Sequence, residues 1–249
     1  MLNRESIVSQ LNSDRYVQGL MLGDCVSSTN TQVKDMAEHG AAEGVTLIAD
    51  TQTAGRGRLG RRFASPQGGL YLSTLLRPSA DADPGIITCR AAVAAARAIE
   101  SVCDLTVEIK WVNDLFIAGR KVAGILAQGV LSPDGGLSAV VLGIGINVCG
   151  TLPEELDGIA TTLAEQGASV SREDLAAAFL NQWERVLTEE DFMTEYRRRS
   201  LVLGREITVV QGGDIYSATA REITDRGHLV VDTATDTRTL TSGEVSVRL

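Results

Sequence analysis

The segment 54–63, AGRGRLGRRF, brings together three glycines and four arginines. Guanidinium groups are rigid, forked donors that match the oxygens of phosphates and carboxylates, and glycine lets a backbone approach a ligand closely. The chain as a whole has a net charge of −9, so this concentration of positive charge favours an anionic partner nearby. The alternative is a solvated loop whose arginines only maintain solubility. The first interpretation predicts that Arg56, Arg58 and Arg61 bind an anion.

The glycines of this segment also match a nucleotide-binding pattern. Gly55, Gly57 and Gly60 have the spacing G-x-G-x-x-G, which binds dinucleotides when it follows a strand and opens a helix. A strand is expected before it, but residues 61–69 contain one proline and two glycines, which disfavour a helix. The pattern therefore does not indicate a nicotinamide or flavin site, and we expect a flexible loop here.

A second candidate group lies in residues 110–125, KWVNDLFIAGRKVAGI. It contains Lys110 and Lys121, two of the three lysines in the chain. A lysine ammonium is a compact charge that can contact a phosphate or a carboxylate, and the carboxylate of Asp114 can hold a divalent cation or orient a lysine. The alternative is that Asn113 and Asp114 only form a turn, as these residue types often do.

A third candidate group is the glycine pair within residues 142–148, LGIGINV. Gly143 and Gly145 interrupt an otherwise apolar strand, and glycine on a strand leaves space above the sheet. One interpretation is that this space admits a flat ligand. The alternative is a β-bulge or the close packing of a helix on the strand.

The surrounding pattern predicts the elements that must position these groups. A short strand and then a helix are expected within residues 20–40, with Ser28 or Thr29 as the helix N-cap. Further strands are expected over 44–52, 69–78 and 137–148, and helices over 84–103 and 171–200, with tight turns near 118–119 and 133–136. Short turns between consecutive strands imply antiparallel pairing, so the fold class is α+β.

The pattern changes near residue 204. From there short strands alternate with turns at 212–213, 226–227 and 242–243, which predicts a small β-barrel. We therefore expect a catalytic domain over residues 1–200 and a second domain over 204–249.

Composition limits the class of protein. The pI of about 4.8 argues against a general nucleic-acid binder. The sequence has no long apolar run and no signal-peptide pattern, which predicts a soluble cytoplasmic protein with no membrane partner. The four cysteines lack C-x-x-C spacing, so a structural zinc site is not expected.

Taken together, the motifs resemble those of the biotin–protein ligase family, also called biotin–[acetyl-CoA-carboxylase] ligase. The matching residues are Ser28-Thr29-Asn30, Gln52 with 55–61, 110–115 with 120–125, and 143–147, and the C-terminal SGEVSVRL resembles the end of the family's barrel. The resemblance covers about residues 20–249. Each motif alone is weak, but the arginine loop followed by the lysine hairpin is highly specific.

The resemblance implies a fold and a reaction. The fold is a mixed, mostly antiparallel sheet with flanking helices, of the class II aminoacyl-tRNA synthetase and biotin ligase type, followed by a small SH3-like barrel. The reaction uses ATP and Mg²⁺ to convert biotin, the substrate, to biotinyl-5′-AMP. The biotinyl group then passes to a specific lysine on a biotin carboxyl carrier protein or domain of a biotin-dependent carboxylase.

The resemblance also implies roles for individual residues. Arg56, Arg58, Lys121 and Asp114 would be catalytic, with Asp114 also a candidate Mg²⁺ ligand. The biotin site would comprise Ser28, Thr29, Asn30, Gln52, Gly55, Arg56, Gly57, Arg58, Lys121, Gly124, Gly143 and Gly145, and the ATP site Arg58, Arg61, Phe63, Lys110, Asn113, Lys121 and Asn147.

The chain departs from the family pattern at three places. Val112 replaces a proline and Phe63 a common tryptophan, and we expect an extended backbone at Val112. Residues 1–19 are too few for the winged helix-turn-helix of family members that repress transcription, so we expect no DNA binding. An open sheet edge in related proteins would allow a homodimer.

Two other functions stay open on the sequence. A lipoate– or octanoate–protein ligase would share a related catalytic fold and also acylate a carrier lysine, although the G-R-G-R loop and the C-terminal barrel favour biotin. A non-catalytic nucleotide- or carrier-binding module would use the same cationic residues without turnover.

Overall fold

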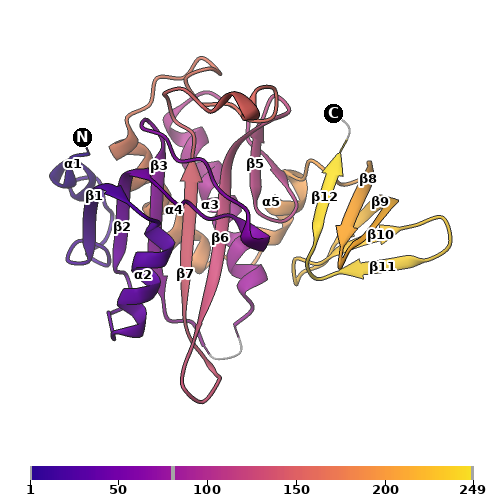
Figure 1. Ribbon diagram of the computed structural model, residues 1–249, viewed down its shortest axis with the longest axis horizontal. Coiled ribbons are helices and arrows are strands. Elements are labelled where there is room, and N and C mark those ends of the chain that lie inside the picture. The colour runs from indigo at the N-terminus through magenta and orange to yellow at the C-terminus, as the bar shows by residue number, and fades with distance from the viewer. Residues whose placement is uncertain (1, 80–81, 248–249) are drawn as a thin grey trace.

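The computed structural model describes residues 2–79 and 82–247 (Figure 1). Residue 1, residues 80–81 and residues 248–249 lie outside the described part, and with them the outer limits of both expected domains and the last two residues of SGEVSVRL.

A seven-stranded sheet forms the centre of the larger part of the molecule. Its strands are β1 (Leu20–Val26), β2 (Thr46–Gln52), β3 (Leu70–Leu76), β4 (Glu108–Lys110), β5 (Asp114–Ile117), β6 (Arg120–Leu131) and β7 (Leu137–Ile146). Their order across the sheet is β1-β2-β3-β7-β6-β5-β4. Strands β1 and β2 are parallel and the other neighbours antiparallel. The expected mixed, mostly antiparallel sheet is therefore confirmed.

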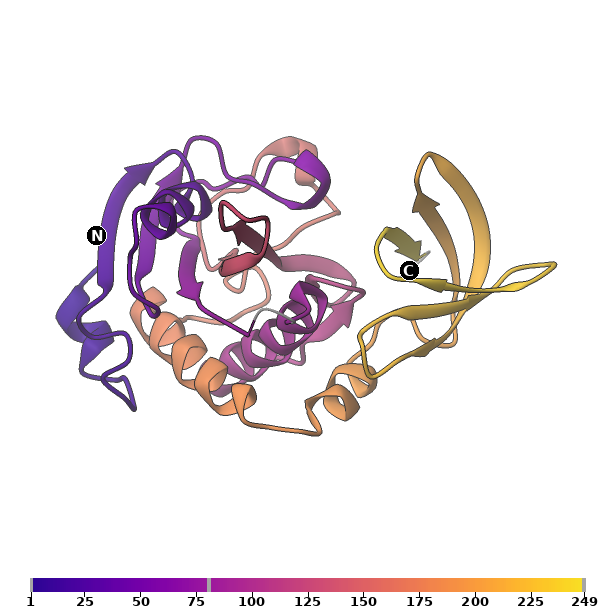
Figure 2. The same ribbon diagram turned by 90° about the horizontal axis from the view of Figure 1, so that it is seen from below.

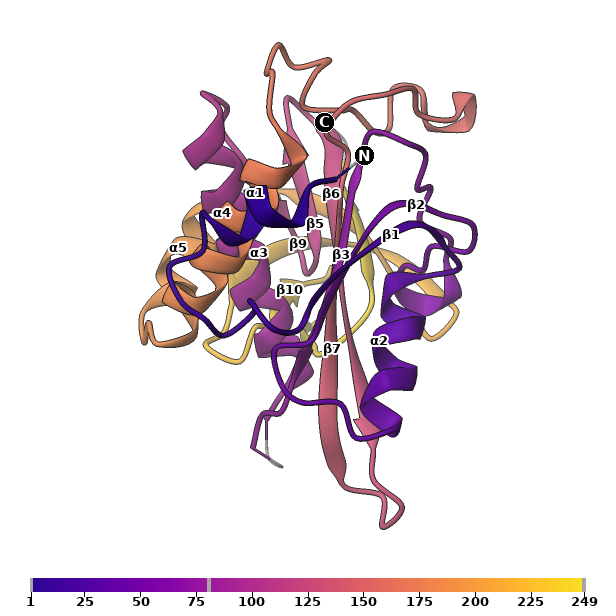
Figure 3. The ribbon, with the colours of Figure 1, turned by 90° about the vertical axis from the view of Figure 1, so that its left-hand side faces the viewer.

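Helices cover both faces of this sheet. They are α1 (Arg4–Val8), α2 (Thr29–Glu38), α3 (Pro84–Val102), α4 (Arg172–Leu187) and α5 (Phe192–Arg198), with short 3₁₀ turns η1 (Arg58–Gly60) and η2 (Glu154–Leu156). Helix α2 lies on one face, and α3 and α4 lie on the opposite face (Figure 3). Six alanines between positions 91 and 98 of α3 are completely buried. Their small side chains let α3 pack closely against its neighbours, and the large side chains of Phe179 and Trp183 of α4 fill the same core.

Local capping explains where the helices begin. The Ser28 hydroxyl accepts a hydrogen bond from the Thr31 N–H, and Asp83 caps α3 with Pro84 in its first turn. The helix expected over 171–200 is instead two helices, which corrects that prediction. The Arg90 guanidinium of α3 donates to the carbonyl oxygens of Val186, Leu187 and Glu189. It thereby provides hydrogen-bond donors for carbonyl groups at the C-terminal end of α4, which have no partner within the helix.

The second sheet contains five antiparallel strands. They are β8 (Glu206–Gln211), β9 (Asp214–Ile223), β10 (Leu229–Asp232), β11 (Thr237–Leu240) and β12 (Glu244–Val247), in the order β11-β10-β9-β8-β12. Glycines with positive φ stand at all three expected turns. Figure 2 shows this curved sheet beyond α5, and the proposed domain boundary near 200–204 falls between α5 and β8.

The described part of the chain contains no helix that is both long enough and apolar enough to cross a membrane.

Candidate functional site

A cavity of about 360 Å³ lies between the first sheet, the arginine-rich loop and strand β12. Every residue expected in the site lines this cavity except Gly55 and Asn147. The expected residues that line it are Ser28, Thr29, Asn30, Gln52, Arg56, Gly57, Arg58, Arg61, Phe63, Lys110, Asn113, Asp114, Lys121, Gly124, Gly143 and Gly145. The arginine loop (54–63) and the lysine hairpin (110–125), which are far apart in sequence, therefore face the same space.

The hairpin of β5 and β6 positions Lys121 against Asp114. Its tight turn uses positive φ at Ala118 (48°) and Gly119 (75°), which brings the two strands back in antiparallel register. The Lys121 Nζ lies 2.7 Å from Asp114 Oδ1. The Lys121 N–H also donates to the Ile159 carbonyl oxygen at 2.9 Å, which fixes the start of β6. The hairpin thus holds its cation at the cavity wall before any ligand is present.

Asn113 connects the lysine hairpin to the arginine loop. Its Nδ2 donates to Asp114 Oδ1 at 3.1 Å and to the Ile125 carbonyl oxygen at 3.0 Å, while its Oδ1 accepts from Arg58 at 3.1 Å. Residues 111–113 form a turn in which the Trp111–Val112 peptide bond is cis. Val112 therefore lies in a turn between β4 and β5 and not in a strand.

Lys110 reaches the cavity from the end of β4. Burial lowers the pKa of its ammonium, and the nearby carboxylates of Asp114 and Glu244 oppose this effect. Its Nζ also lies 5.6 Å from the centre of the Phe116 ring, within cation–π range. An anionic ligand next to Lys110 would stabilise the charged form of its ammonium against this effect of burial.

Gly55 holds the base of the arginine loop and does not line the cavity. Its carbonyl oxygen accepts from the Phe63 N–H at 2.9 Å, and a side chain at Gly55 would come within 2.4 Å of the Phe63 carbonyl oxygen. Further along the loop, the guanidinium of Arg61 forms a two-pronged ion pair with Glu244 of β12. The second sheet therefore contacts the loop directly.

The glycines on β6 and β7 do not leave open space in this structure. A Cβ on Gly145 would lie 2.4 Å from the Phe63 ring, and one on Gly124 would lie 3.1 Å from it. A Cβ on Gly143 would lie 1.8 Å from Asn30 Oδ1. Asn30 therefore packs directly against Gly143, and the role of Gly143 in leaving room for a flat ligand stays a prediction. Phe63, expected to face the nucleotide, packs against Gly124 and Gly145 of the expected biotin site.

Asn147 does not reach the cavity either. It is 6% exposed, and its Nδ2 donates to the Thr161 carbonyl oxygen at 3.2 Å. Its N–H donates to the Val122 carbonyl oxygen at 2.8 Å. These contacts join the segment after β7 to β6, so the expected contact of Asn147 with a nucleotide is replaced by a packing role in this structure.

Several lining residues were missed by sequence reasoning. They are mainly Leu156 and Ile159, from the segment after β7, and Glu244 and Val245 of β12. Ile159 is 60% exposed although it is large and apolar. Such exposure can indicate a binding surface, but it can be seen only in a structure. The sequence around Glu244 gives no indication that it lines the cavity, because its partner Arg61 is 183 residues away along the chain.

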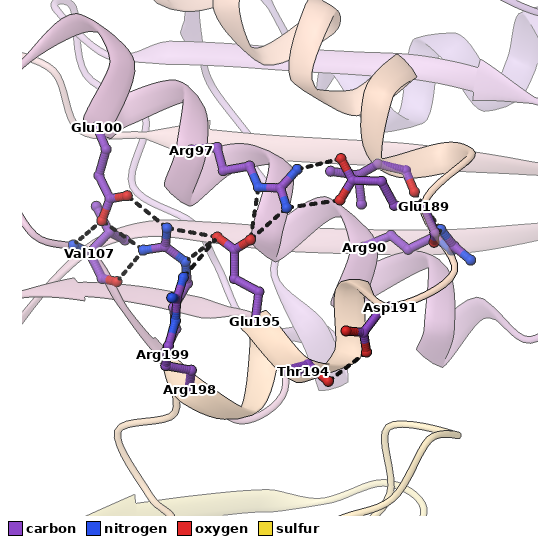
Figure 4. A network of polar contacts seen from close by, with 11 residues as sticks. Arg90, Arg97, Glu100, Val107, Glu189, Asp191, Thr194, Glu195, Arg198 and Arg199 are labelled. Atoms are coloured by element: carbon purple, nitrogen blue, oxygen red, sulfur yellow. Dashed lines mark hydrogen bonds and ion pairs between the residues drawn. The ribbon is translucent and has the colours of Figure 1, made fainter.

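Figure 4 shows a chain of ion pairs between helices. Arg199 pairs with Glu100 at 2.7 Å and with Glu195 at 2.8 Å, and Arg97 joins Glu195 to Glu189. These side chains connect α3, the end of α4 and α5.

The same network supports the strand that carries Lys110. The Arg199 guanidinium donates to the Val107 carbonyl oxygen at 3.2 Å, and its own carbonyl oxygen accepts from the Ile109 N–H at 2.8 Å. Tyr196 of α5 donates to the Val112 carbonyl oxygen at 3.0 Å. The network therefore holds residues 107–112 at the edge of the sheet.

The ion pairs of Glu195 should contribute to the free energy of unfolding at neutral pH, and this contribution should be lost in acid. Burial raises the pKa of its carboxyl, but hydrogen bonds from Arg97 and Arg199 outweigh burial and hold the pKa below its usual value of 4.5. Glu195→Gln should lower the free energy of unfolding at pH 7 by about 2 kcal/mol, since two guanidinium groups lose a charged partner. Because the folded-state pKa is lowered, this contribution is complete above the usual pKa and is lost as pH falls through the lowered one.

Urea unfolding at pH 7 and at successively lower pH measures this difference. The neighbouring Glu190→Gln is a matched control, because Glu190 forms no ion pair within the described residues and should change stability by less than about 0.5 kcal/mol. Equal losses for the two variants, or a difference that persists in acid, would contradict the role assigned to Glu195.

The fold and the site define a class of protein: a two-sheet protein that holds arginines and lysines around one cavity suited to anionic substrates. Residues 22–147 match the Biotin/lipoate A/B protein ligase family, and residues 202–248 match the Biotin protein ligase C terminal domain. The chain belongs to the biotin/lipoate A/B protein ligase family.

Individual relatives agree with this assignment. The chain is 34% identical to the biotin–[acetyl-CoA-carboxylase] ligase of Mycobacterium tuberculosis, over 88% of this chain and 85% of that protein. It is 30% identical to the bifunctional ligase/repressor BirA of Bacillus spizizenii, over 99% of this chain and 79% of that protein. The structure of biotin protein ligase from Aquifex aeolicus in complex with biotin and ATP has a TM-score of 0.81 and 30% identity, covering 93% of this chain and 99% of that one.

Proposed function

We propose that this protein activates biotin with ATP as biotinyl-5′-AMP and transfers it to a lysine of a biotin carboxyl carrier protein. One observation carries the proposal: Arg56, Arg58, Arg61 and Lys121 converge on a single cavity. Family membership and the likeness to a ligase solved with biotin and ATP support it. The match of residues 202–248 to the C-terminal domain of biotin protein ligases favours biotin over lipoate or octanoate.

The first step joins two anions. An oxygen of the biotin carboxylate attacks the α-phosphorus of ATP, the bond from that phosphorus to the bridging oxygen breaks, and pyrophosphate leaves. The carboxylate and the triphosphate repel one another because both are anionic, and negative charge shifts to the leaving pyrophosphate. Fixed cations are therefore the main source of transition-state stabilisation. Lys121 would bridge the carboxylate and the α-phosphate, with Arg56 and Arg58 beside it. Lys110 and Arg61 would contact the remaining phosphates.

The donor set fits a Mg²⁺ ion held mainly by the nucleotide. The described residues contain no cluster of three or more histidines, cysteines, aspartates or glutamates that could bind a metal by themselves. Mg²⁺ usually binds through one or two carboxylates and the substrate phosphates. Asp114, whose Oδ1 contacts Lys121 and Asn113, would supply the one carboxylate. The ion would neutralise phosphate charge.

The second step forms an amide. The carrier lysine amine attacks the carbonyl carbon of the mixed anhydride, AMP leaves with the bonding electrons, and the amine loses a proton. Asp114 would orient the amine or accept that proton, since it already binds the ammonium of Lys121 at 2.7 Å. The arginine loop would cover the adenylate and exclude water until the carrier docks.

Mass spectrometry of a biotin carrier domain after incubation with the protein, ATP, Mg²⁺ and biotin tests the proposal. A mass increase of one biotinyl group on a single lysine is expected. Biotin-dependent ATP–pyrophosphate exchange should accompany it. Modification with lipoate or octanoate instead, or binding of ATP without any turnover, would favour one of the two other functions considered above.

The proposal also covers location and assembly. We infer a cytoplasmic enzyme that does not bind DNA, and a homodimer through the open edge at β1 is compatible with the sheet order. Filter binding with DNA and analytical ultracentrifugation test these two points separately from ligase activity.

A further inference from the structure

A buried hydroxyl behind the cavity contacts two residues of the proposed biotin site. Ser73 of β3 is completely buried and does not line the cavity. Its Oγ lies 2.6 Å from Asn30 Oδ1 and 2.7 Å from Thr29 Oγ1. A serine hydroxyl has one proton, so Ser73 can donate in only one of these two contacts. The other contact must receive its proton from the partner.

The orientation of Asn30 decides which contact Ser73 donates to. Asn30 Nδ2 donates to Gln128 Oε1 at 2.8 Å and lies 3.3 Å from the Leu126 carbonyl oxygen. A backbone carbonyl can only accept, so the amide nitrogen must point there and Oδ1 must face Ser73. An amide oxygen also only accepts. The proton of Ser73 is therefore committed to Asn30.

Thr29 must then donate its own proton to Ser73, because either hydroxyl of such a pair can be the donor. This leaves Thr29 Oγ1 and Gln52 Oε1, 3.1 Å apart, without a hydrogen between them. Gln52 cannot turn its amide around, since its Oε1 accepts from the Thr29 N–H at 2.8 Å and its Nε2 donates to Ser65 at 2.8 Å. Two acceptor oxygens thus face each other at the cavity wall.

We propose that Ser73 is a specificity-determining positioning residue, which keeps the Thr29–Gln52 pair as an acceptor site for an N–H group of the ligand. The inference rests on the proposed function. The ureido ring of biotin offers N–H donors, whereas the dithiolane ring of lipoate and the alkyl tail of octanoate offer none. In this arrangement Gln52 Oε1 accepts only from the Thr29 N–H and Thr29 Oγ1 accepts from no donor, so both oxygens can accept from a ligand N–H. A ligand without an N–H leaves the two oxygens facing each other with no hydrogen between them, which disfavours it.

Removal of the Ser73 hydroxyl should let Thr29 and Gln52 form a hydrogen bond with each other. In Ser73→Ala the proton of Thr29 is free to turn to Gln52 Oε1, which closes the acceptor site. We expect the KM for biotin to rise about tenfold, while kcat and the KM for ATP stay within about twofold. A ground-state binding loss of this kind separates KM from kcat.

Biotin analogues methylated on one or the other ureido nitrogen give the decisive measurement. Calorimetric titration would compare biotin and each analogue on the wild-type protein and on Ser73→Ala. For one nitrogen, methylation should weaken binding by about tenfold more in the wild-type protein than in the variant, because the variant no longer uses that N–H. If methylation costs the same factor in both proteins for both nitrogens, the inference is wrong.

Two further variants separate this effect from packing. Ser73→Cys keeps nearly the same size with a weak S–H donor, and should fold and show an intermediate loss of biotin affinity. Thr74→Val removes the next buried hydroxyl of β3, whose Oγ1 lies 2.9 Å from Thr46 Oγ1 on the other face of the strand, and should leave biotin binding unchanged. If the wild-type protein binds no biotin, the proposed function fails. If the wild-type protein binds biotin but Ser73→Cys and Thr74→Val have the same affinity for biotin, only the Ser73 inference fails.

Discussion

Lys121→Gln should lower the rate of biotin-dependent ATP–pyrophosphate exchange by about a thousandfold. Lys121 is the cation that the β5–β6 hairpin holds at the cavity wall, 2.7 Å from Asp114. Glutamine is similar in length but carries no charge, so it cannot neutralise the carboxylate and the phosphate as they approach. The loss should appear chiefly in kcat, because the charge that Lys121 stabilises grows in the transition state.

A second lysine provides the matched control for this experiment. Lys34 lies on α2, with its side chain 45% exposed and a weak pair to Glu38 at 3.7 Å. Lys34→Gln should leave exchange unchanged within about twofold. Urea unfolding of both variants shows whether each is folded. A folded Lys121→Gln protein that retained most of its exchange activity would remove the central role proposed for this residue.

Arg58→Gly should release the adenylate from the protein and label lysines indiscriminately. Arg58 donates to Asn113 Oδ1 at 3.1 Å, and this contact ties the arginine loop to the turn beside Asp114. Without it the loop loses an anchor and its positive charge, so the reactive mixed anhydride is less well covered. The adenylate would then reach amines in solution.

Mass spectrometry of a mixture of the carrier domain and an unrelated protein measures this effect. The variant should label several lysines on both, whereas the wild-type protein should label one lysine on the carrier. Arg62→Gly is the control, because it adds a glycine to the same loop and leaves the Asn113 contact in place. Labelling confined to the natural carrier lysine in Arg58→Gly would contradict the covering role of the loop.

Much of the site could be predicted because its chemistry lies in short, compositionally unusual segments. Arginines concentrated in an acidic chain, two lysines flanking a tight turn and a paired glycine on a strand each point to a ligand. The hairpin that unites Lys121 and Asp114 follows from local turn chemistry, and so does the cap at Ser28. These features depend on neighbours in sequence.

What could not be predicted depends on partners far along the chain. The Arg61–Glu244 ion pair joins the arginine loop to the second sheet, and the helix break after residue 187 depends on Arg90 of another helix. Phe63 fills the space over Gly145, and Asn147 turns toward Thr161. In each case a glycine or polar residue satisfies a tertiary neighbour, and local pattern does not distinguish that neighbour from a ligand.

The cavity wall runs from Ser28 to Val245, which has a consequence for biosynthesis. At the usual 5–20 residues per second, a ribosome needs roughly 6–25 s to add the residues between Lys121 and Val245. During that interval the strand that supplies Glu244 is missing, and β7, which lies between β3 and β6 in the sheet, must be made before the arginine loop and the lysine hairpin can face the same cavity. The cavity is therefore complete only after its last wall, strand β12, has been translated.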